Sequence, residues 1–140
     1  MTTLTNGLFA EHERGGATSV ELALLWSAML VMILGVIQVS LVAYAGQLAL
    51  TAAQDGLRSG RTYRAAPVEA ALIAAARLDA ERFLARASGT VLTDVVVTAE
   101  VDSGTGNLRV QVTGSALSLV PGVPLTVKRE AVAPMERVTP

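Results

Sequence analysis

Two neighbouring features near the start of the chain could take part in chemistry: the glycine pair Gly15 and Gly16, and the lone carboxylate of Glu21. Glycine resists helix formation and lets another backbone approach closely, so we expect the pair to supply extended backbone beside a helix start, where the main chain can be recognised. No charged side chain occurs between Glu21 and Asp55, so Glu21 stands at the start of an uncharged run. A carboxylate enclosed by apolar helices needs a cation beside it. The residues therefore support backbone recognition and ion pairing.

The other reactive side chains do not form a catalytic set. The chain has one histidine, His12, and no cysteine, and no Ser/His/Asp set or metal-ligand spacing follows. Asp79 and Glu81 are two residues apart on a predicted helix and therefore lie on different faces. A net charge of −1 gives no basic surface for nucleic acid. We predict a protein that is not an enzyme, with no cofactor, no metal, no small-molecule substrate and no nucleic-acid partner.

An apolar stretch from Leu22 to Ala45 is long enough for a transmembrane helix, which needs at least about 18 apolar residues. Trp26 and Tyr44 are 18 residues apart (44 − 26), or about 27 Å of helix, which matches two interfacial aromatic belts. The alternative is that Trp26 is an ordinary lipid-facing aromatic. The sequence predicts a single-pass membrane helix with its span at about residues 22–45. Its clearly polar interruptions are Ser27, Gln38 and Ser40.

The residues before this helix do not form an ordinary signal peptide. Residues 1–16 have no apolar core, and they carry a short charged tract of Glu11, His12, Glu13 and Arg14. The absence of cysteine excludes a lipoprotein anchor and disulfides. A leader of this kind, if removed, must be cut before the hydrophobic helix.

The segment from Glu13 to Leu24, which reads Glu-Arg-Gly-Gly-Ala-Thr-Ser-Val-Glu-Leu-Ala-Leu, resembles a prepilin processing site. More narrowly, it resembles the TadE-like family of tight-adherence (Flp) pilus-assembly proteins. The likeness continues through residues 34–38 and 55–58 and reappears at 130–137. The resemblance implies cleavage by a prepilin peptidase between Gly16 and Ala17, methylation of the new Ala17 amine, and a role as a pseudopilin or minor pilin.

The resemblance also implies partners and a location. The partners are membrane lipid, the prepilin peptidase, other pilins or pseudopilins and the pilus assembly platform. The location is the bacterial cytoplasmic membrane, with the N-terminus cytoplasmic and the C-terminal part extracytoplasmic, or an extracellular pilus. The positive-inside rule favours the reverse orientation, because Arg14 precedes the span and Arg58, Arg61 and Arg64 follow it. We nevertheless expect the N-terminus to be cytoplasmic, because the resemblance implies a leader that is cut on the cytoplasmic side. The alternative function is an uncleaved single-pass anchor for an extracytoplasmic adaptor domain.

Glu21 has two explanations. In the first turn of a helix, the helix dipole favours a carboxylate by roughly 0.3–1 kcal/mol. The other explanation is assembly: insertion scales put an acidic residue at mid-bilayer near +2.5–3.5 kcal/mol. Cleavage would create a positive amine at Ala17, and the amine of one subunit could neutralise Glu21 of its neighbour.

Small residues continue beyond the span. Spacings of three and four place them on one side of a helix, where they allow close approach of another helix. We predict helix packing in a bundle through Gly46, Ala49, Ala53, Gly56 and Gly60. The alternative is that alanine serves here only as a good helix former.

The remaining chain predicts a small α+β head. Pro67 can open an amphipathic helix that ends near Gly89, with an apolar face running from Leu72 to Ala87. Alternation predicts strands at about 95–101 and 108–113, joined by a turn at 102–107, and a third at 125–132. The fold class is α+β: a long N-terminal hydrophobic helix and then one helix packed on a three-stranded antiparallel sheet. The predicted divisions are a leader at 1–16, a helix at 17–64, a head at 65–133 and a tail at 134–140.

Overall fold

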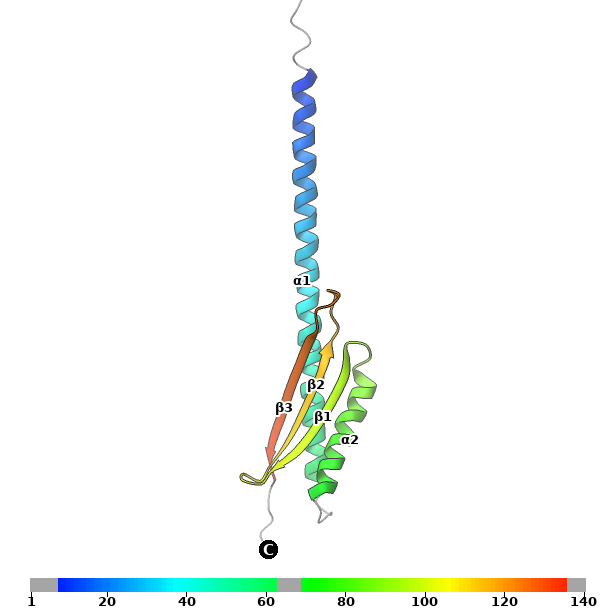
Figure 1. The fold of residues 1–140 in the computed structure, drawn as a ribbon, viewed down its shortest axis with the longest axis vertical. Helices are drawn as coiled ribbons and strands as arrows, with labels where there is room; N and C mark the ends of the chain where they lie inside the picture. Colours follow the sequence, from blue (N-terminus) through cyan, green and yellow to red (C-terminus); the bar gives the residue numbers. More distant parts are fainter. Residues whose placement is uncertain (1–7, 63–68, 136–140) are drawn as a thin grey trace, which may run out of the picture. The chain divides into compact units, whose positions relative to one another are not determined.

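A computed structural model describes residues 8–62 and 69–135, which form two helices followed by three strands (Figure 1). The predicted α+β fold is confirmed. The chain divides into a first unit, residues 1–37, and a folded unit, residues 38–140, and helix α1 contributes to both. Arg64, Pro67 and most of the predicted tail lie outside the described residues. The elements are α1 Leu8–Thr62, α2 Glu69–Ala87, β1 Leu92–Asp102, β2 Asn107–Ala116 and β3 Leu125–Pro134.

Helix α1 begins earlier than the sequence predicted. We expected extended backbone at Gly15 and Gly16 and a helix that starts near Ala17, but α1 begins at Leu8 and runs through both glycines. Each glycine costs about 1 kcal/mol relative to alanine in a helix, whereas an existing helix gains a hydrogen bond with each residue that it adds. Propagation from the long apolar run therefore outweighs the glycine pair, and the expectation of extended backbone was wrong.

Helix α2 has the amphipathic pattern that the sequence predicted. Ala76, Ala80 and Leu84 are buried on one face. On the exposed side, Arg77 Nε lies 2.7 Å from Glu81 Oε1, one turn further along. The apolar face is therefore used for the core, and the charged face is solvated.

The end of α2 is capped by Ser88, the residue that directly follows the helix. The Ser88 hydroxyl donates to the carbonyl of Leu84 at 2.7 Å, and the Val91 N–H donates to the carbonyl of Ser88 at 2.9 Å. Gly89 has a φ of +50°, a conformation that glycine adopts without a Cβ clash. The predicted helix end at this glycine is confirmed, and the chain turns directly into β1.

The three strands form an antiparallel sheet in the order β1-β2-β3. Leu108, Val110 and Val112 of the central strand are fully buried on its inner face. The outer face is polar, and Arg109 Nη1 lies 3.3 Å from Glu130 Oε2 on the neighbouring strand. One face therefore belongs to the core and the other to water, as the alternation in the sequence predicted.

Edge strand β3 turns a charged residue toward the inner face. Arg129 pairs in register with the buried Val112, which places both side chains on one face of the sheet. A Cβ built on Gly46 of α1 would lie 3.0 Å from an Arg129 guanidinium nitrogen. An inward-pointing charge on an edge strand also discourages pairing with another sheet.

The core lies between the inner face of the sheet and the two helices. Figure 1 shows α2 and the C-terminal part of α1 behind the strands, and buried residues from all of these elements form one cluster. From α1, the buried members are mainly alanines, while the sheet supplies larger side chains such as Leu92 and Val112. Small residues on the helices therefore face large residues on the sheet.

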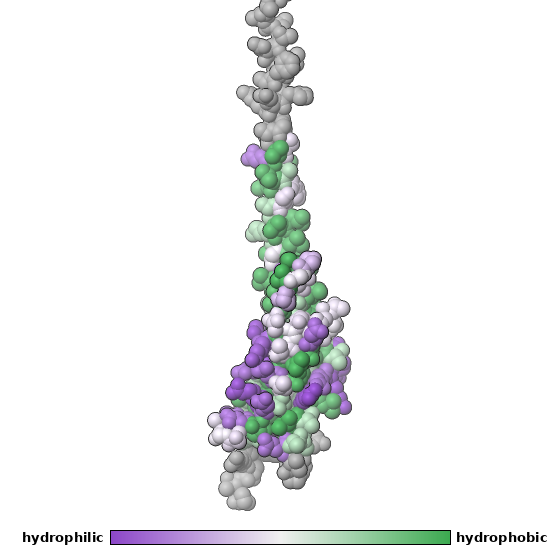
Figure 2. All heavy atoms as spheres, viewed as in Figure 1, coloured by the Kyte–Doolittle hydropathy of each residue, from purple (hydrophilic) through white to green (hydrophobic). Residues whose placement is uncertain are grey.

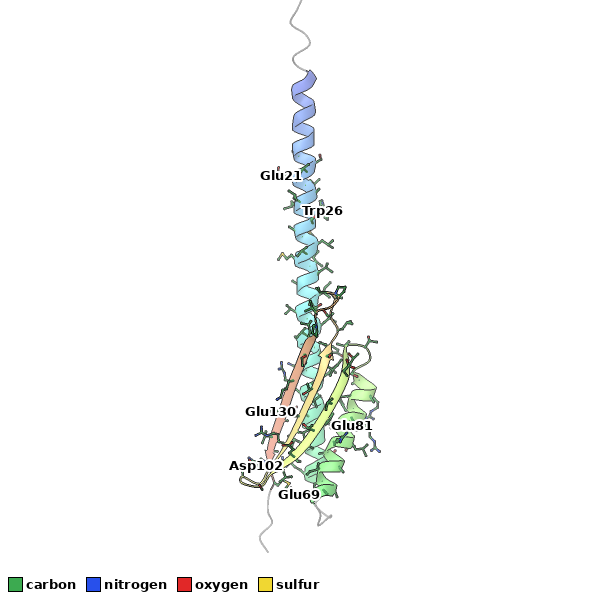
Figure 3. The ribbon with its side chains drawn as sticks, viewed as in Figure 1. Glu21, Trp26, Glu69, Glu81, Asp102 and Glu130 are labelled. Atoms are coloured by element: carbon green, nitrogen blue, oxygen red, sulfur yellow. The ribbon has the colours of Figure 1, made fainter. Side chains whose placement is uncertain are left out.

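The β1–β2 turn is organised by Asp102, which lies where the two strands meet (Figure 3). Its carboxylate accepts hydrogen bonds from the Thr105 hydroxyl at 2.8 Å and the Gly104 N–H at 2.9 Å. Its carbonyl accepts one from the Gly106 N–H at 2.7 Å, and Gly106 has a φ of +69°. Bonds to the ionised carboxylate, first that of Thr105 and then that of Gly104, hold the pKa of Asp102 below its ordinary value.

Replacing Thr105 by Val should raise the pKa of Asp102 toward its ordinary value, because the largest cause of the lowering is lost. Since the folded pKa is depressed, the turn's contribution to stability is present above the unfolded pKa and is lost as pH falls through the folded pKa. An NMR titration of the Asp102 side-chain carbonyl carbon measures the shift. Ser103→Ala is the control, because the lowering is caused by Gly104, Thr105 and Arg109. Equal pKa values in the two variants would contradict the assignment.

Candidate processing and assembly site

The N-terminal part of α1 exposes a continuous apolar surface. Every residue from Thr18 to Ile37, here called the exposed helical segment, is exposed, and Figure 2 shows hydrophobic residues along it. Within Thr18–Arg61, the most apolar window has a mean hydropathy of 2.4 and no buried residues. The helix is long and apolar enough to cross a membrane. Its exposed large side chains include Leu24, Leu25, Trp26, Met29, Leu30, Val31, Met32, Ile33 and Val36.

Polar groups within this segment are few and differ in how they are satisfied. The Ser27 hydroxyl donates to the carbonyl of Ala23 at 2.8 Å, so this donor is satisfied by the backbone of its own helix. Glu21 and Trp26 both project from α1 and are exposed (Figure 3). The carboxylate of Glu21 is therefore available to a partner outside the helix.

The predicted processing junction lies on this same helix. Gly16 and Ala17 are in helical conformation, and their side chains lie outside the described set. Ala17 and Glu21 are four residues apart, which is about one helical turn and places them on one face. The predicted junction therefore lies about one helical turn before Glu21 on α1.

The small-residue stripe is used inside the protein's own fold. Ala49 and Ala53 are fully buried, and Gly46, Gly56 and Gly60 are buried as well. A Cβ built on Gly56 would lie 2.6 Å from the carbonyl oxygen of Ala76 in α2. The close approach that the spacing predicted exists, but its partners are α2 and the sheet of the same chain. A sequence pattern shows that a helix face is small without showing which surface covers it.

Gly60 makes the same point at the next turn of α1. A Cβ at this position would lie 2.6 Å from Leu108 Cδ2 and 3.3 Å from Ala76 Cβ. The glycine therefore lets a large side chain of β2 and an alanine of α2 reach the helix backbone. Of the basic residues near this end of α1, Arg58 and Arg61 are exposed, and Arg64 lies outside the described residues.

Gln38 is a residue whose role the sequence did not reveal. Its side-chain amide donates to the carbonyl of Leu117 at 3.1 Å and accepts from the N–H of Leu119 at 2.6 Å. The sequence marked Gln38 only as a polar interruption of the apolar run. Because its partners are 79 and 81 positions away, no local pattern could have found them.

The folded unit also includes the last part of the predicted span. Val42 packs against the core, and Ala45 is fully buried in it. Tyr44, between them, is exposed. The exposed apolar surface of α1 is therefore broadest between Thr18 and Ile37. Within the part of the chain that the structure describes, no three acidic or histidine side chains gather in a way that could hold a metal ion.

These features define a class of protein: one with a membrane-length apolar helix whose C-terminal half belongs to a small α+β fold. Residues 16–58 match the family model described as TadE-like protein, and this confirms the predicted resemblance over that segment. The matched residues include Gly16, Glu21 and most of the small-residue stripe, while the motif at 130–137 lies outside them. No curated protein and no solved structure matched the chain.

Replacing Gly56 by Ala should lower the free energy of unfolding of the folded unit by about 1–2 kcal/mol. The added methyl would meet a backbone carbonyl, and overpacking of this kind outweighs the helix propensity gained. Gly46→Ala is the matched control, because its methyl meets only the flexible Arg129 side chain. We expect it to be neutral or stabilising by up to about 1 kcal/mol. Thermal unfolding of the full chain in mild detergent, followed by circular dichroism, makes the comparison; equal losses would refute close packing at Gly56.

Proposed function

We propose that the protein is a TadE-like pseudopilin or minor pilin that takes part in assembling a tight-adherence pilus or a related secretion filament. The observation that carries the proposal is the family match, which begins at Gly16. A shared segment that starts at the predicted junction agrees with a leader that is removed before the protein acts. In this proposal α1 is inserted in the cytoplasmic membrane and the folded unit is extracytoplasmic.

The exposed helical segment is the surface proposed to meet other pilins. The small-residue stripe is covered by α2 and the sheet, so it is not available to a neighbouring subunit. Residues 18–37 are exposed and mainly apolar, and they carry the carboxylate of Glu21. Helices of this kind pack side by side in lipid through van der Waals contact and polar pairs. Assembly is therefore assigned to this segment.

The protein is proposed to be a substrate of a prepilin peptidase and to have no catalytic activity of its own. Cleavage after Gly16 would remove the charged tract Glu11–Arg14 and leave Ala17 as a positively charged N-terminus. That amine would lie one helical turn from Glu21 and within reach of the carboxylate of an adjacent subunit. The reaction thus creates the cation that an enclosed carboxylate requires.

An uncleaved membrane-anchored adaptor is the second candidate. The observation that favours it is the helical backbone at Gly15 and Gly16, because a peptidase acting there needs an extended substrate. In this case α1 tethers the folded unit to a membrane complex. Because α1 of the intact chain begins at Leu8, Glu21 lies well beyond its first turn, so the helix dipole does not explain the carboxylate in this candidate. The first candidate requires the helix to unwind locally at the glycine pair, where unwinding costs least.

The mature N-terminus separates the two candidates. In cells with an active prepilin peptidase, intact-mass analysis of the membrane-extracted protein should show a chain that begins at Ala17. A Gly16→Leu variant should retain the leader, because the bulky side chain blocks close backbone approach. A wild-type chain that keeps residues 1–16 beside an active peptidase would exclude the first candidate and support the adaptor.

Replacement of Glu21 by Ala should sharply reduce incorporation into filaments, measured by the amount of the protein in sheared pilus fractions. Glu21→Gln, which keeps the shape and removes the charge, should be reduced as well, because ion pairing needs the carboxylate. If the dipole alone mattered, either change would cost the helix only about 0.3–1 kcal/mol. Glu100→Ala is the control, since Glu100 is exposed on the sheet. Normal incorporation of both Glu21 variants would count against pairing.

A further inference from the structure

We infer that the β2–β3 loop, residues 117–124, is a second membrane-contact surface, which places its apolar side chains in the interfacial region of the bilayer that α1 enters. The inference rests on the membrane insertion in the proposed function. The partner of the loop is the lipid surface itself, and this contact fixes the β2–β3 end of the folded unit at the membrane.

The loop is apolar, exposed and uncharged. No charged residue occurs between Arg109 and Lys128. An exposed apolar cluster of this kind marks a contact surface for a membrane or another protein. Its members are Leu117, Leu119, Val120 and Val123, which are 42, 43, 54 and 46% exposed.

Gln38 ties this loop to the helix. The Leu119 N–H lies 2.6 Å from Gln38 Oε1, and Gln38 Nε2 lies 3.1 Å from the Leu117 carbonyl (Figure 1 shows the loop beside α1). An amide in an apolar medium is costly unless both its donor and its acceptor are satisfied. The loop supplies one acceptor for the Nε2 group and one donor for Oε1, so the two bonds hold the loop at this position of α1.

The position of Gln38 along α1 corresponds to a membrane boundary. Gln38 directly follows the exposed helical segment, which has 20 residues (37 − 18 + 1). A helix needs about 20 apolar residues to cross a hydrocarbon core. When this segment crosses the core, as in the proposed function, Gln38 is the first residue after it. A loop fixed at Gln38 therefore meets lipid where the interface begins.

Most backbone N–H groups of the loop are also satisfied within the protein, as a position near the hydrocarbon requires. N–H groups with acceptors inside the protein are those of Leu117, Leu119, Val120 and Val123. Pro121 and Pro124 have no N–H group. Irregular backbone is tolerated near the hydrocarbon only where its polar groups are satisfied, and this loop meets that condition to a large extent.

The opposite end of the sheet is polar. The β1–β2 turn holds Asp102, Thr105 and Asn107, and it lies nine positions along β2 from Ala116, or about 30 Å at 3.3–3.4 Å per residue. The sheet thus has one apolar end, which is attached to α1 at Gln38, and one polar end. This polarity fits a lipid surface at one end only, and it favours the bilayer over a protein partner.

Site-directed spin labelling tests the inference on the full chain, which has no native cysteine. Single variants Leu119→Cys, Ile33→Cys and Thr105→Cys are labelled and reconstituted in vesicles of phosphatidylethanolamine and phosphatidylglycerol. Collision rates with oxygen, which favours lipid, and with a polar nickel complex are then compared. Val120→Cys provides a second probe of the loop if Leu119→Cys disturbs the fold.

We expect the oxygen-to-nickel ratio at residues 119 and 120 to exceed that at residue 105 several-fold and to approach that at residue 33. A ratio at the loop equal to that at residue 105, with residue 33 in lipid, overturns the loop inference and leaves membrane insertion in place. A water-like ratio at residue 33 overturns insertion, and the proposed function fails with it.

Discussion

The close contact between α1 and α2 is the constraint on which the rest of the fold depends. At Gly56 the two helices approach so closely that a single methyl would collide with the Ala76 carbonyl, and at Gly60 the same stripe admits Leu108 from the sheet. Alanine and glycine bury little apolar area, so their contribution comes from dense van der Waals contact rather than from large side chains. The sheet supplies the larger apolar surface that this face of α1 lacks. Without the stripe, the C-terminal half of α1 would have no place in the core.

This arrangement divides one helix between two environments. From residue 38 onward, α1 has one face committed to the folded unit, and before residue 38 every described side chain is exposed. A helix that served only as a tether would need no such commitment, because a short flexible linker would connect the two parts.

Local patterns predicted the elements of the fold, and long-range contacts set what the elements do. Period-two alternation in β2 and the polar turn after Asp102 were enough to predict the hairpin, and the apolar face of α2 was readable from its spacing. The start of α1 could not be predicted from the glycine pair. Two glycines cost a helix only about 2 kcal/mol, and propagation from the long apolar run outweighs that cost. The small-residue stripe and Gln38 were recognised as unusual, but their partners are distant in the sequence. The type of a residue shows what it needs, such as a close neighbour for glycine or hydrogen-bond partners for an amide. Only the fold shows which residues supply it.

Glu21 and Gln38 illustrate this difference at the two ends of the same uncharged helix. A neutral amide can be satisfied by backbone groups, and Gln38 finds both of its partners in the β2–β3 loop. An ionised carboxylate in an apolar bundle needs a cation. Among the side chains that the structure describes, the next basic residue along α1 is Arg58, 37 positions away in the sequence (58 − 21). The proposed cleavage would remove Arg14 and create an amine at Ala17, so the stretch from residue 17 to the next charge at Asp55 would carry one positive and one negative group. Because that pair is neutral only when both members are present, the proposed processing would link cleavage to the lateral packing of α1, and an unprocessed helix would enter a bundle with an uncompensated charge.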